Sequence, residues 1–188
     1  VVGTNINQNT AYTIGRTFAY TVINRLKSNI IATGYDGRLT SPDLHKALCK
    51  GLKDSGAKVI NIGMGPTPMT YFAHYHLNAD AAIMVTGSHN PSEYNGFKMV
   101  LNKHSFYAED IQSLQKLIDQ NDLKLIEGEI INQDIKKDYN ERLLQNINLN
   151  KKIKIAWDIG NGAMGAVIKE VTNNLNNSKN ILINEEVD

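Results

Sequence analysis

The chain has 188 residues, of which 41% are hydrophobic and 21% charged, a composition typical of folded globular proteins that excludes extended disorder. Its formal net charge of +1 provides no strong field for nucleic acid or for an acidic membrane, so neither is an expected partner. The single cysteine, Cys49, excludes an internal disulfide, and we interpret it as a half-buried structural thiol. Neither a membrane-length apolar run nor a signal-peptide pattern is present, which predicts a cytoplasmic protein in a reducing compartment.

Predicted helices and strands alternate over the first part of the chain. Buried strands are expected at residues 30–33, 59–62, 81–85 and 97–101, and helices at 10–27, 41–56, 69–76 and 108–120. Asn9 or Thr10 is the expected cap of the first helix, and Ser41 is the expected cap of the second. In the last of these helices, Ile111, Leu114, Leu117 and Ile118 are expected to face inward.

A second unit is predicted from residue 134 onward. A helix over 134–147 is followed by a strand over 153–157, a helix over 163–173 and a strand over 181–183, which together predict a βαβ unit. The predicted fold class is therefore α/β. A mixed, largely parallel sheet sandwiched by helices occupies residues 1–133, and the start of a second, similar domain occupies 134–188. Because the chain begins without methionine and ends after an apolar stretch, we expect it to be part of a longer protein.

The loop after the predicted strand at 81–85 holds the best candidate for chemistry. Ligands of open α/β sheets bind beyond the carboxyl ends of the strands. Ser88 lies there after Gly87, which permits a tight turn, and before a stiffening proline. Ser88 is thus a candidate nucleophile or phosphate carrier, although a serine in such a loop is more often a turn residue. The G-x-S-x-G elbow of acyl-transfer enzymes requires glycine where Asn90 stands, so acyl transfer is disfavoured.

Other polar residues near this loop allow more than one interpretation. Lys98, ten positions after the serine on the next predicted strand, would return a cation to the same pocket. His89 alone is more often a loop histidine than a base. His74 and His76 point to different sides of a helix, so a solvated helix is favoured over a metal site. From the residues alone, the prediction is an α/β domain with an anion site near the loop serine.

A series of motifs points to one family. The chain contains Gly-Tyr-Asp-Gly-Arg at 34–38 with Ser-Pro at 41–42, Pro-Thr-Pro at 66–68, Thr-Gly-Ser-His-Asn-Pro at 86–91, Asn-Gly-Phe-Lys at 95–98, and Asp158 followed by Gly-Asn-Gly at 160–162. In content and order these motifs resemble the α-D-phosphohexomutase family, of the phosphomannomutase/phosphoglucomutase type. The resemblance covers most of the chain.

This resemblance implies that Ser88, His89 and Lys98 are catalytic residues. The family's matching serine carries a phosphate that passes to a hexose monophosphate, giving a hexose 1,6-bisphosphate. The other phosphate then returns to the serine, so that the 1- and 6-phosphates of mannose or glucose interconvert. Lys98 matches a residue that assists proton transfer or charge neutralisation, and His89 matches one that lines the site. The implied cofactor is Mg²⁺, held by the Ser88 phosphate and by three aspartates that would lie beyond residue 188. No other cofactor-binding residue is implied.

Two alternatives stay open beside a phosphomannomutase/phosphoglucomutase: a phosphoglucosamine mutase, and a non-catalytic phosphosugar-binding remnant. The family's metal-binding aspartate loop and its later sugar- and phosphate-binding loops have no match in the chain. The family's arginine signature near its start would lie before Val1. We therefore expect an N-terminal portion that is inactive alone.

Overall fold

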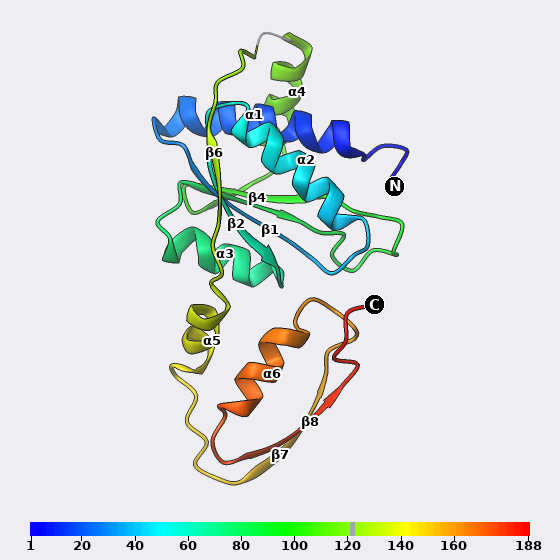
Figure 1. Cartoon of the computed structure of the whole chain (residues 1–188), viewed down its shortest axis with the longest axis vertical. Helices are drawn as coiled ribbons and strands as arrows, with labels where there is room; N and C mark the ends of the chain where they lie inside the picture. Colours follow the sequence, from blue (N-terminus) through cyan, green and yellow to red (C-terminus); the bar gives the residue numbers. More distant parts are fainter. Residues whose placement is uncertain (121–122) are drawn as a thin grey trace.

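A six-stranded sheet with the order β5-β4-β3-β1-β2-β6 forms the centre of the molecule (Figure 1). The computed structural model describes residues 1–120 and 123–188. The strands are β1 (Ile30–Tyr35), β2 (Lys58–Met64), β3 (Ala81–Val85), β4 (Phe97–Leu101), β5 (His104–Phe106) and β6 (Glu129–Asn132). β1 pairs in parallel with β2 and β3, and β2 with β6, whereas β3 and β5 flank β4 in antiparallel fashion. The predicted mixed, largely parallel sheet is confirmed.

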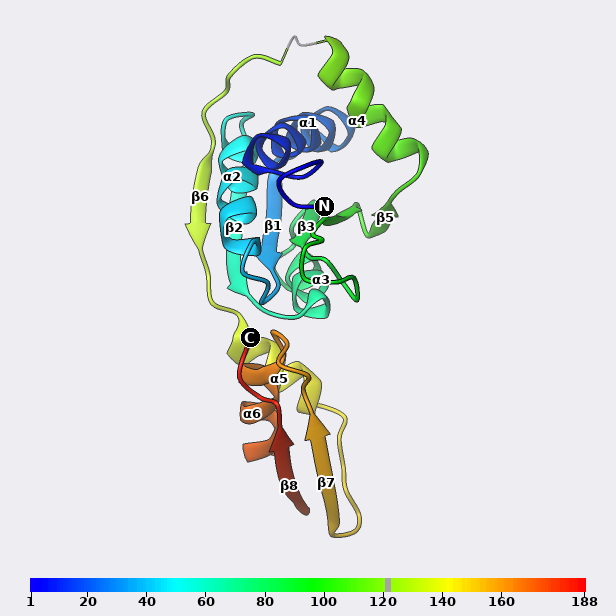
Figure 2. The same ribbon diagram turned by 90° about the vertical axis from the view of Figure 1, so that its right-hand side faces the viewer.

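Helices cover both faces of this sheet, as the alternating pattern predicts. On one face lie α1 (Gln8–Leu26), α2 (Ser41–Lys53) and α4 (Glu109–Gln120), and on the other lies α3 (Thr67–His76) (Figures 1 and 2). Phe18 of α1 and Leu48 of α2 are fully buried in one core cluster with Ile83 of β3. α1 and α2 approach so closely that a side-chain carbon on Gly51 would collide with the Tyr12 carbonyl. Apolar burial on both faces therefore holds the sheet in a three-layer arrangement.

The residues after β6 build a separate two-stranded sheet. Its elements are α5 (Lys136–Leu144), β7 (Ile153–Asp158), α6 (Gly165–Asn173) and β8 (Ser178–Ile183). β7 and β8 pair in parallel on either side of α6, which confirms the predicted βαβ unit. One core cluster joins Ile135 and Val167 of this part to Met69 and Ala73 of α3. The domain boundary between residues 133 and 134 stays a prediction, because apolar packing continues across it.

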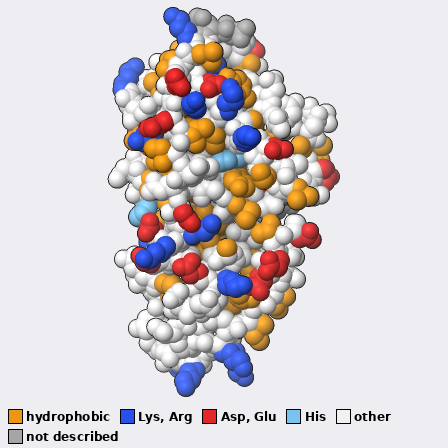
Figure 3. All heavy atoms as spheres, viewed as in Figure 1, with side chains coloured by type: hydrophobic (Ala, Val, Ile, Leu, Met, Phe, Trp, Pro, Cys, Tyr) orange, Lys and Arg blue, Asp and Glu red, His pale blue; other side chains and the backbone are white. Residues whose placement is uncertain are grey.

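The surface carries no broad field of one charge on the face shown in Figure 3, where basic and acidic side chains alternate. This agrees with the formal net charge of +1. In the part of the chain that the structure describes, none of the helices combines the length and the apolar character that crossing a membrane requires.

The structure corrects several local predictions. Asn7, not Asn9 or Thr10, caps α1, because its side-chain oxygen accepts a hydrogen bond from Thr10 N at 2.9 Å. Ser41 is the first residue of α2 rather than its cap, and its hydroxyl donates to Asp36 Oδ1 at 2.5 Å. The short strands β5 and β6 were outside the prediction, since three or four residues at a sheet edge carry little periodic signal.

Two side chains lie opposite to their predicted environment. His74 is only 2% exposed, so the prediction of a solvated histidine is wrong. Its Nε2 accepts a hydrogen bond from Lys103 N at 3.0 Å, and burial lowers its pKa. Ile111 is 46% exposed instead of facing inward, whereas Leu114 is buried as predicted. The face of α4 that packs on the core is therefore narrower than the apolar pattern of its sequence suggests.

A buried polar cluster lies between α2 and β1. His45 Nε2 is 3.1 Å from Thr33 Oγ1 and 3.4 Å from Cys49 Sγ. Burial lowers the pKa of His45 to about 4 and raises the pKa of Cys49 to about 11. A thiol with so high a pKa is a poor nucleophile, so Cys49 is structural and more fully buried than its sequence suggested, with 4% exposure.

The burial of His45 predicts a loss of stability in mild acid. The unfolded chain takes up the histidine proton near pH 6.5, whereas the folded chain resists it until about pH 4. The free energy of unfolding should therefore fall as pH drops through this window, by about 2 kcal/mol between pH 7 and pH 5 from this residue. Urea unfolding at the two pH values measures the change. His45→Gln should reduce this dependence of the free energy of unfolding on pH, whereas His104→Gln, at an exposed histidine, should leave it unaltered. The same pH dependence in the wild-type protein and both variants would contradict the prediction.

Candidate functional site

The loop after β3 holds Ser88 in an unusual backbone conformation. Its φ is 54°, in the left-handed region that most residues avoid. Ser88 N donates to Thr86 Oγ1 at 2.9 Å, and Thr86 N donates to Gly96 O at 2.9 Å. These bonds tie the start of the loop to its return into β4. As a result, the Ser88 side chain is exposed at the carboxyl end of the sheet.

The three predicted site residues lie together. Lys98 stands opposite Met84 in the β3–β4 register, and its Nζ donates to Ser88 Oγ at 3.3 Å. His89 Nδ1 is also 3.3 Å from Ser88 Oγ. Lys98 Nζ and His89 Nδ1 are thus both within hydrogen-bonding distance of the Ser88 hydroxyl. Their catalytic roles stay a prediction, which this proximity supports.

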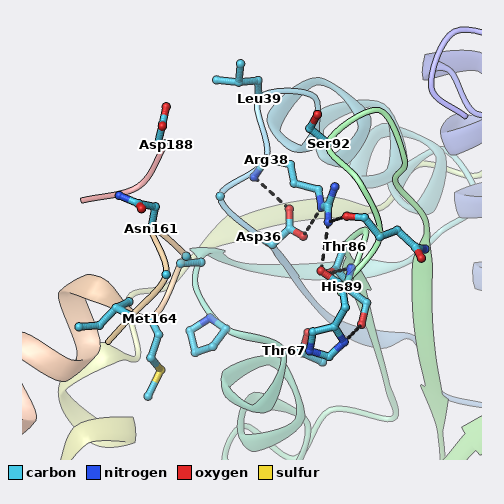
Figure 4. A pocket seen from close by; sticks show the side chains of 18 of the residues that line it. Asp36, Arg38, Leu39, Thr67, Thr86, His89, Ser92, Asn161, Met164 and Asp188 are labelled. Atoms are coloured by element: carbon cyan, nitrogen blue, oxygen red, sulfur yellow. Dashed lines mark hydrogen bonds and ion pairs between the residues drawn. The ribbon is translucent and has the colours of Figure 1, made fainter. Parts of the chain in front are cut away.

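The turn after β1, with Asp36 and Arg38, contacts the serine loop. The sequence did not predict this supporting role. Asp36 Oδ2 accepts from Gly87 N at 3.2 Å and lies 3.4 Å from Arg38 Nε. Arg38 in turn donates to carbonyl oxygens of the loop, as its orientation between Asp36 and the loop in Figure 4 illustrates. Backbone carbonyls leave no pattern in a sequence, so the only signal for Arg38 was its place in the 34–38 motif.

The return of the loop is anchored on α2. Asn95 is 8% exposed, and its Nδ2 donates to Thr40 Oγ1 at 3.0 Å and to Ser41 Oγ at 2.9 Å. Its Oδ1 accepts from Gly96 N at 2.8 Å. Because Asn95 uses both ends of its amide, the chain enters β4 in one register, which sets the position of Lys98.

An open cleft of about 1280 Å³ lies in front of the serine. One wall carries Ser88, His89 and Lys98, and the floor includes the start of α3 at Thr67. The opposite wall is the loop between β7 and α6, where Asn161 and Met164 face the cleft together with Asp188 (Figure 4). The cleft is wide enough for a sugar phosphate.

The described residues do not by themselves form a metal site. Within residues 1–120 and 123–188, no group of three or more His, Cys, Asp or Glu side chains could hold an ion. Asp36, which contacts the serine loop, is engaged by Ser41, Gly87 and Arg38. Mg²⁺ prefers six oxygen ligands, so these side chains do not fit it without further ligands.

Comparison with known proteins points to one family. The family model for phosphoglucomutase/phosphomannomutase, alpha/beta/alpha domain I, matches residues 1–125. A phosphomannomutase/phosphoglucomutase from Pseudomonas putida is 39% identical over 91% of the chain, and a phosphoglucomutase from Neisseria meningitidis is 37% identical over 94%. The chain spans only 37% and 39% of the lengths of these relatives.

A solved structure has the same fold over nearly the whole chain. It is a phosphoglucomutase/phosphomannomutase family protein from Burkholderia thailandensis, with a TM-score of 0.91 and 34% identity. The match covers 99% of this chain and 42% of that one. A putative phosphomannomutase from Thermus thermophilus, at 24% identity, supports the fold with a TM-score of 0.84.

Proposed function

Because the chain belongs to the phosphoglucomutase/phosphomannomutase family, we propose that it carries the phosphoserine segment of a mutase that interconverts the 1- and 6-phosphates of mannose or glucose. The observation that carries the proposal is the position of Ser88 Oγ at the cleft, with Lys98 Nζ and His89 Nδ1 each 3.3 Å away. The names of the Pseudomonas and Neisseria relatives agree with this substrate class.

The proposed reaction is a pair of phosphoryl transfers. In the first, a free hydroxyl of the hexose monophosphate attacks the phosphorus on Ser88; a sugar O–P bond forms, the Ser88 Oγ–P bond breaks, the sugar hydroxyl gives its proton to a nearby base, and Ser88 Oγ takes one up. In the second, Ser88 Oγ gives up its proton and attacks the other phosphate of the bisphosphate; a Ser88 Oγ–P bond forms, the sugar O–P bond at that position breaks, and the sugar oxygen takes up a proton. The serine is phosphorylated again and the sugar phosphate has changed position. Such transfers depend on alignment and charge stabilisation.

Lys98 and His89 supply the charge and the proton transfer in this proposal. The Lys98 ammonium would offset negative charge on the transferring phosphate and on Ser88 Oγ, as fixed cations do at phosphoryl groups. His89, through the Nδ1 that faces Ser88 Oγ, would hold or accept a proton as the serine changes between ester and free hydroxyl.

We also propose that the active protein uses Mg²⁺ and that this chain supplies one ligand, a phosphate oxygen on Ser88. The remaining ligands would come from outside residues 1–188, since the side chains described here do not complete a site. Bound Mg²⁺ would neutralise phosphate charge. It follows that residues 1–188 alone would be inactive. Residues 1–133 would form one domain and 134–188 the start of another, in a cytoplasmic protein.

Conversion of sugar phosphates by the complete gene product tests the proposal. The protein is primed with a hexose 1,6-bisphosphate and Mg²⁺, and the 1-phosphates of mannose, glucose and glucosamine are each supplied as substrate. We expect conversion of mannose and glucose 1-phosphates to the 6-phosphates, and one phosphate mapped to Ser88 by mass spectrometry. Selective conversion of the glucosamine compound would indicate phosphoglucosamine mutase. Binding without conversion would indicate a phosphosugar-binding protein.

A further inference from the structure

Both Nη atoms of Arg38 donate hydrogen bonds to acceptors within the protein. Nη1 donates to Pro91 O at 2.7 Å and to Tyr94 O at 3.1 Å. Nη2 donates to Asn90 O at 2.6 Å and to Ser88 O at 3.1 Å. Nε lies 3.4 Å from Asp36 Oδ2. A guanidinium has five N–H groups in a fixed planar fork, so the four Nη donors are used by loop carbonyls and Nε lies in an ion pair with Asp36.

The four carbonyl acceptors all belong to the loop that carries Ser88. The loop leaves β3 and returns to β4, and Arg38 reaches into its centre from the turn after β1 (Figure 4). The Arg38 side chain is only 16% exposed. Hydrogen bonds from a charged donor are stronger than neutral ones, and they are stronger still away from water. One side chain therefore fixes the path of the loop at both its start and its end.

The direction of these carbonyls also determines where the loop amides point. In a trans peptide the N–H points opposite to the C=O. Because Ser88 O faces Arg38, the N–H of His89 is turned away from Arg38. His89 N has no hydrogen-bond acceptor among the residues that the structure describes. The His89 N–H is therefore an unused donor in the residue that follows Ser88, available to phosphate oxygens.

Gly87 allows this close approach. A side-chain carbon on Gly87 would collide with the Arg38 guanidinium and lie close to Tyr94 O. Asp36 completes the arrangement, because it holds both Gly87 N and Arg38 Nε. The contact between Arg38 and the loop thus depends on a position without a Cβ, Gly87, and on the half-buried carboxylate of Asp36.

We infer that Arg38 is a positioning residue: it clamps residues 88–94 through their carbonyl oxygens and so orients Ser88 and the His89 amide for phosphoryl transfer. This inference rests on the proposed function. It assigns the two nearby cations different tasks, since Lys98 contacts the reacting oxygen whereas Arg38 acts through the backbone. Lysine cannot replace Arg38 in this role, because a single ammonium has three donors and cannot span four carbonyls.

Arg38→Lys in the complete gene product tests the clamp. We expect phosphorylation of Ser88 by hexose bisphosphate, and kcat, to fall about 10²-fold, the cost of a small misplacement of a reacting group. KM should stay close to the wild-type value, since the Nη donors of Arg38 are used by the loop carbonyls. Hydrogen exchange at the amides of residues 88–94 should accelerate about tenfold or more. Arg25→Lys, which alters a surface pair with Asp110, is the matched control and should change none of these quantities.

The outcomes separate the clamp from the proposed function. Wild-type rates of both phosphorylation and amide exchange in Arg38→Lys would overturn the clamp. If the wild-type protein accepts no phosphate on Ser88, the proposed function fails, and amide exchange alone decides whether Arg38 holds the loop. If Arg38→Lys does not fold, Asp36→Asn takes its place: faster exchange in residues 88–94 is the result expected of a clamp, and unchanged exchange overturns it.

Discussion

Replacing Ser88 with alanine should abolish both the covalent phosphate and the mutase activity of the complete gene product. The hydroxyl oxygen is the only atom of this side chain that can form the phosphate ester, and it is the atom that both Lys98 Nζ and His89 Nδ1 approach. Loss of an essential nucleophile in other enzymes lowers turnover by about 10⁶-fold, so we expect a loss of at least about 10⁴-fold here. Intact-mass analysis after treatment with hexose bisphosphate, together with turnover, measures both effects.

Ser92→Ala is the matched control for this experiment. Ser92 lies in the same loop and is exposed, but it is not within the group formed by Ser88, His89 and Lys98. This variant should accept one phosphate and turn over at the wild-type rate. Full mutase activity in Ser88→Ala, or a phosphate that maps to Ser92, would remove Ser88 from the mechanism.

Replacing Lys98 with alanine should lower turnover about 10³-fold, a loss comparable to that of one preorganised electrostatic donor in other active sites. Its ammonium is the group that donates to Ser88 Oγ, where negative charge develops as the phosphate leaves. Binding of the sugar should suffer less than turnover, because the lysine contacts the transferring phosphate. Steady-state kinetics with glucose 1-phosphate separate kcat from KM.

Lys116→Ala controls for the general loss of a lysine, since Lys116 is exposed on α4, away from the cleft. It should behave as the wild-type protein. Lys98→Ala with near wild-type kcat would show that Lys98 is merely a solvated lysine on a strand. Equal losses in the two lysine variants would instead indicate a dependence on net charge.

The sheet and the location of the serine were accessible from the sequence because they depend on local patterns. The continuous apolar run of β3 predicts a buried strand, and the polar residues that follow it place Ser88 at the carboxyl end. Lys98 was predictable for the same reason, since β4 is a second apolar run that begins shortly afterwards. In contrast, β6 is a four-residue edge strand with every residue exposed, and its pairing with β2 has no local signature.

Contacts that depend on the tertiary fold could not be predicted. Arg38 binds carbonyl oxygens about fifty positions away in the chain. Because every residue has a backbone carbonyl, nothing in the sequence of the loop marks those that Arg38 binds. His74 is buried because β4 and β5 bring Lys103 N within 3.0 Å of it. Several polar residues near the start of α1 are of the types that cap helices. Asn7 is the cap because its backbone is extended where the helix begins, which the sequence does not show.

The packing of α5 against both α3 and α6 limits how the cleft can close around a ligand. Val167 and Val171 share a core cluster with Tyr139 of α5 and Met69 of α3, so one apolar core joins the walls that carry Asn161 and Thr67. Sliding one wall past the other would expose this apolar surface at about 25 cal/mol for each Å². These two walls should therefore keep a fixed separation. Any segment that closes over the cleft to exclude water during phosphoryl transfer has to come from another part of the protein.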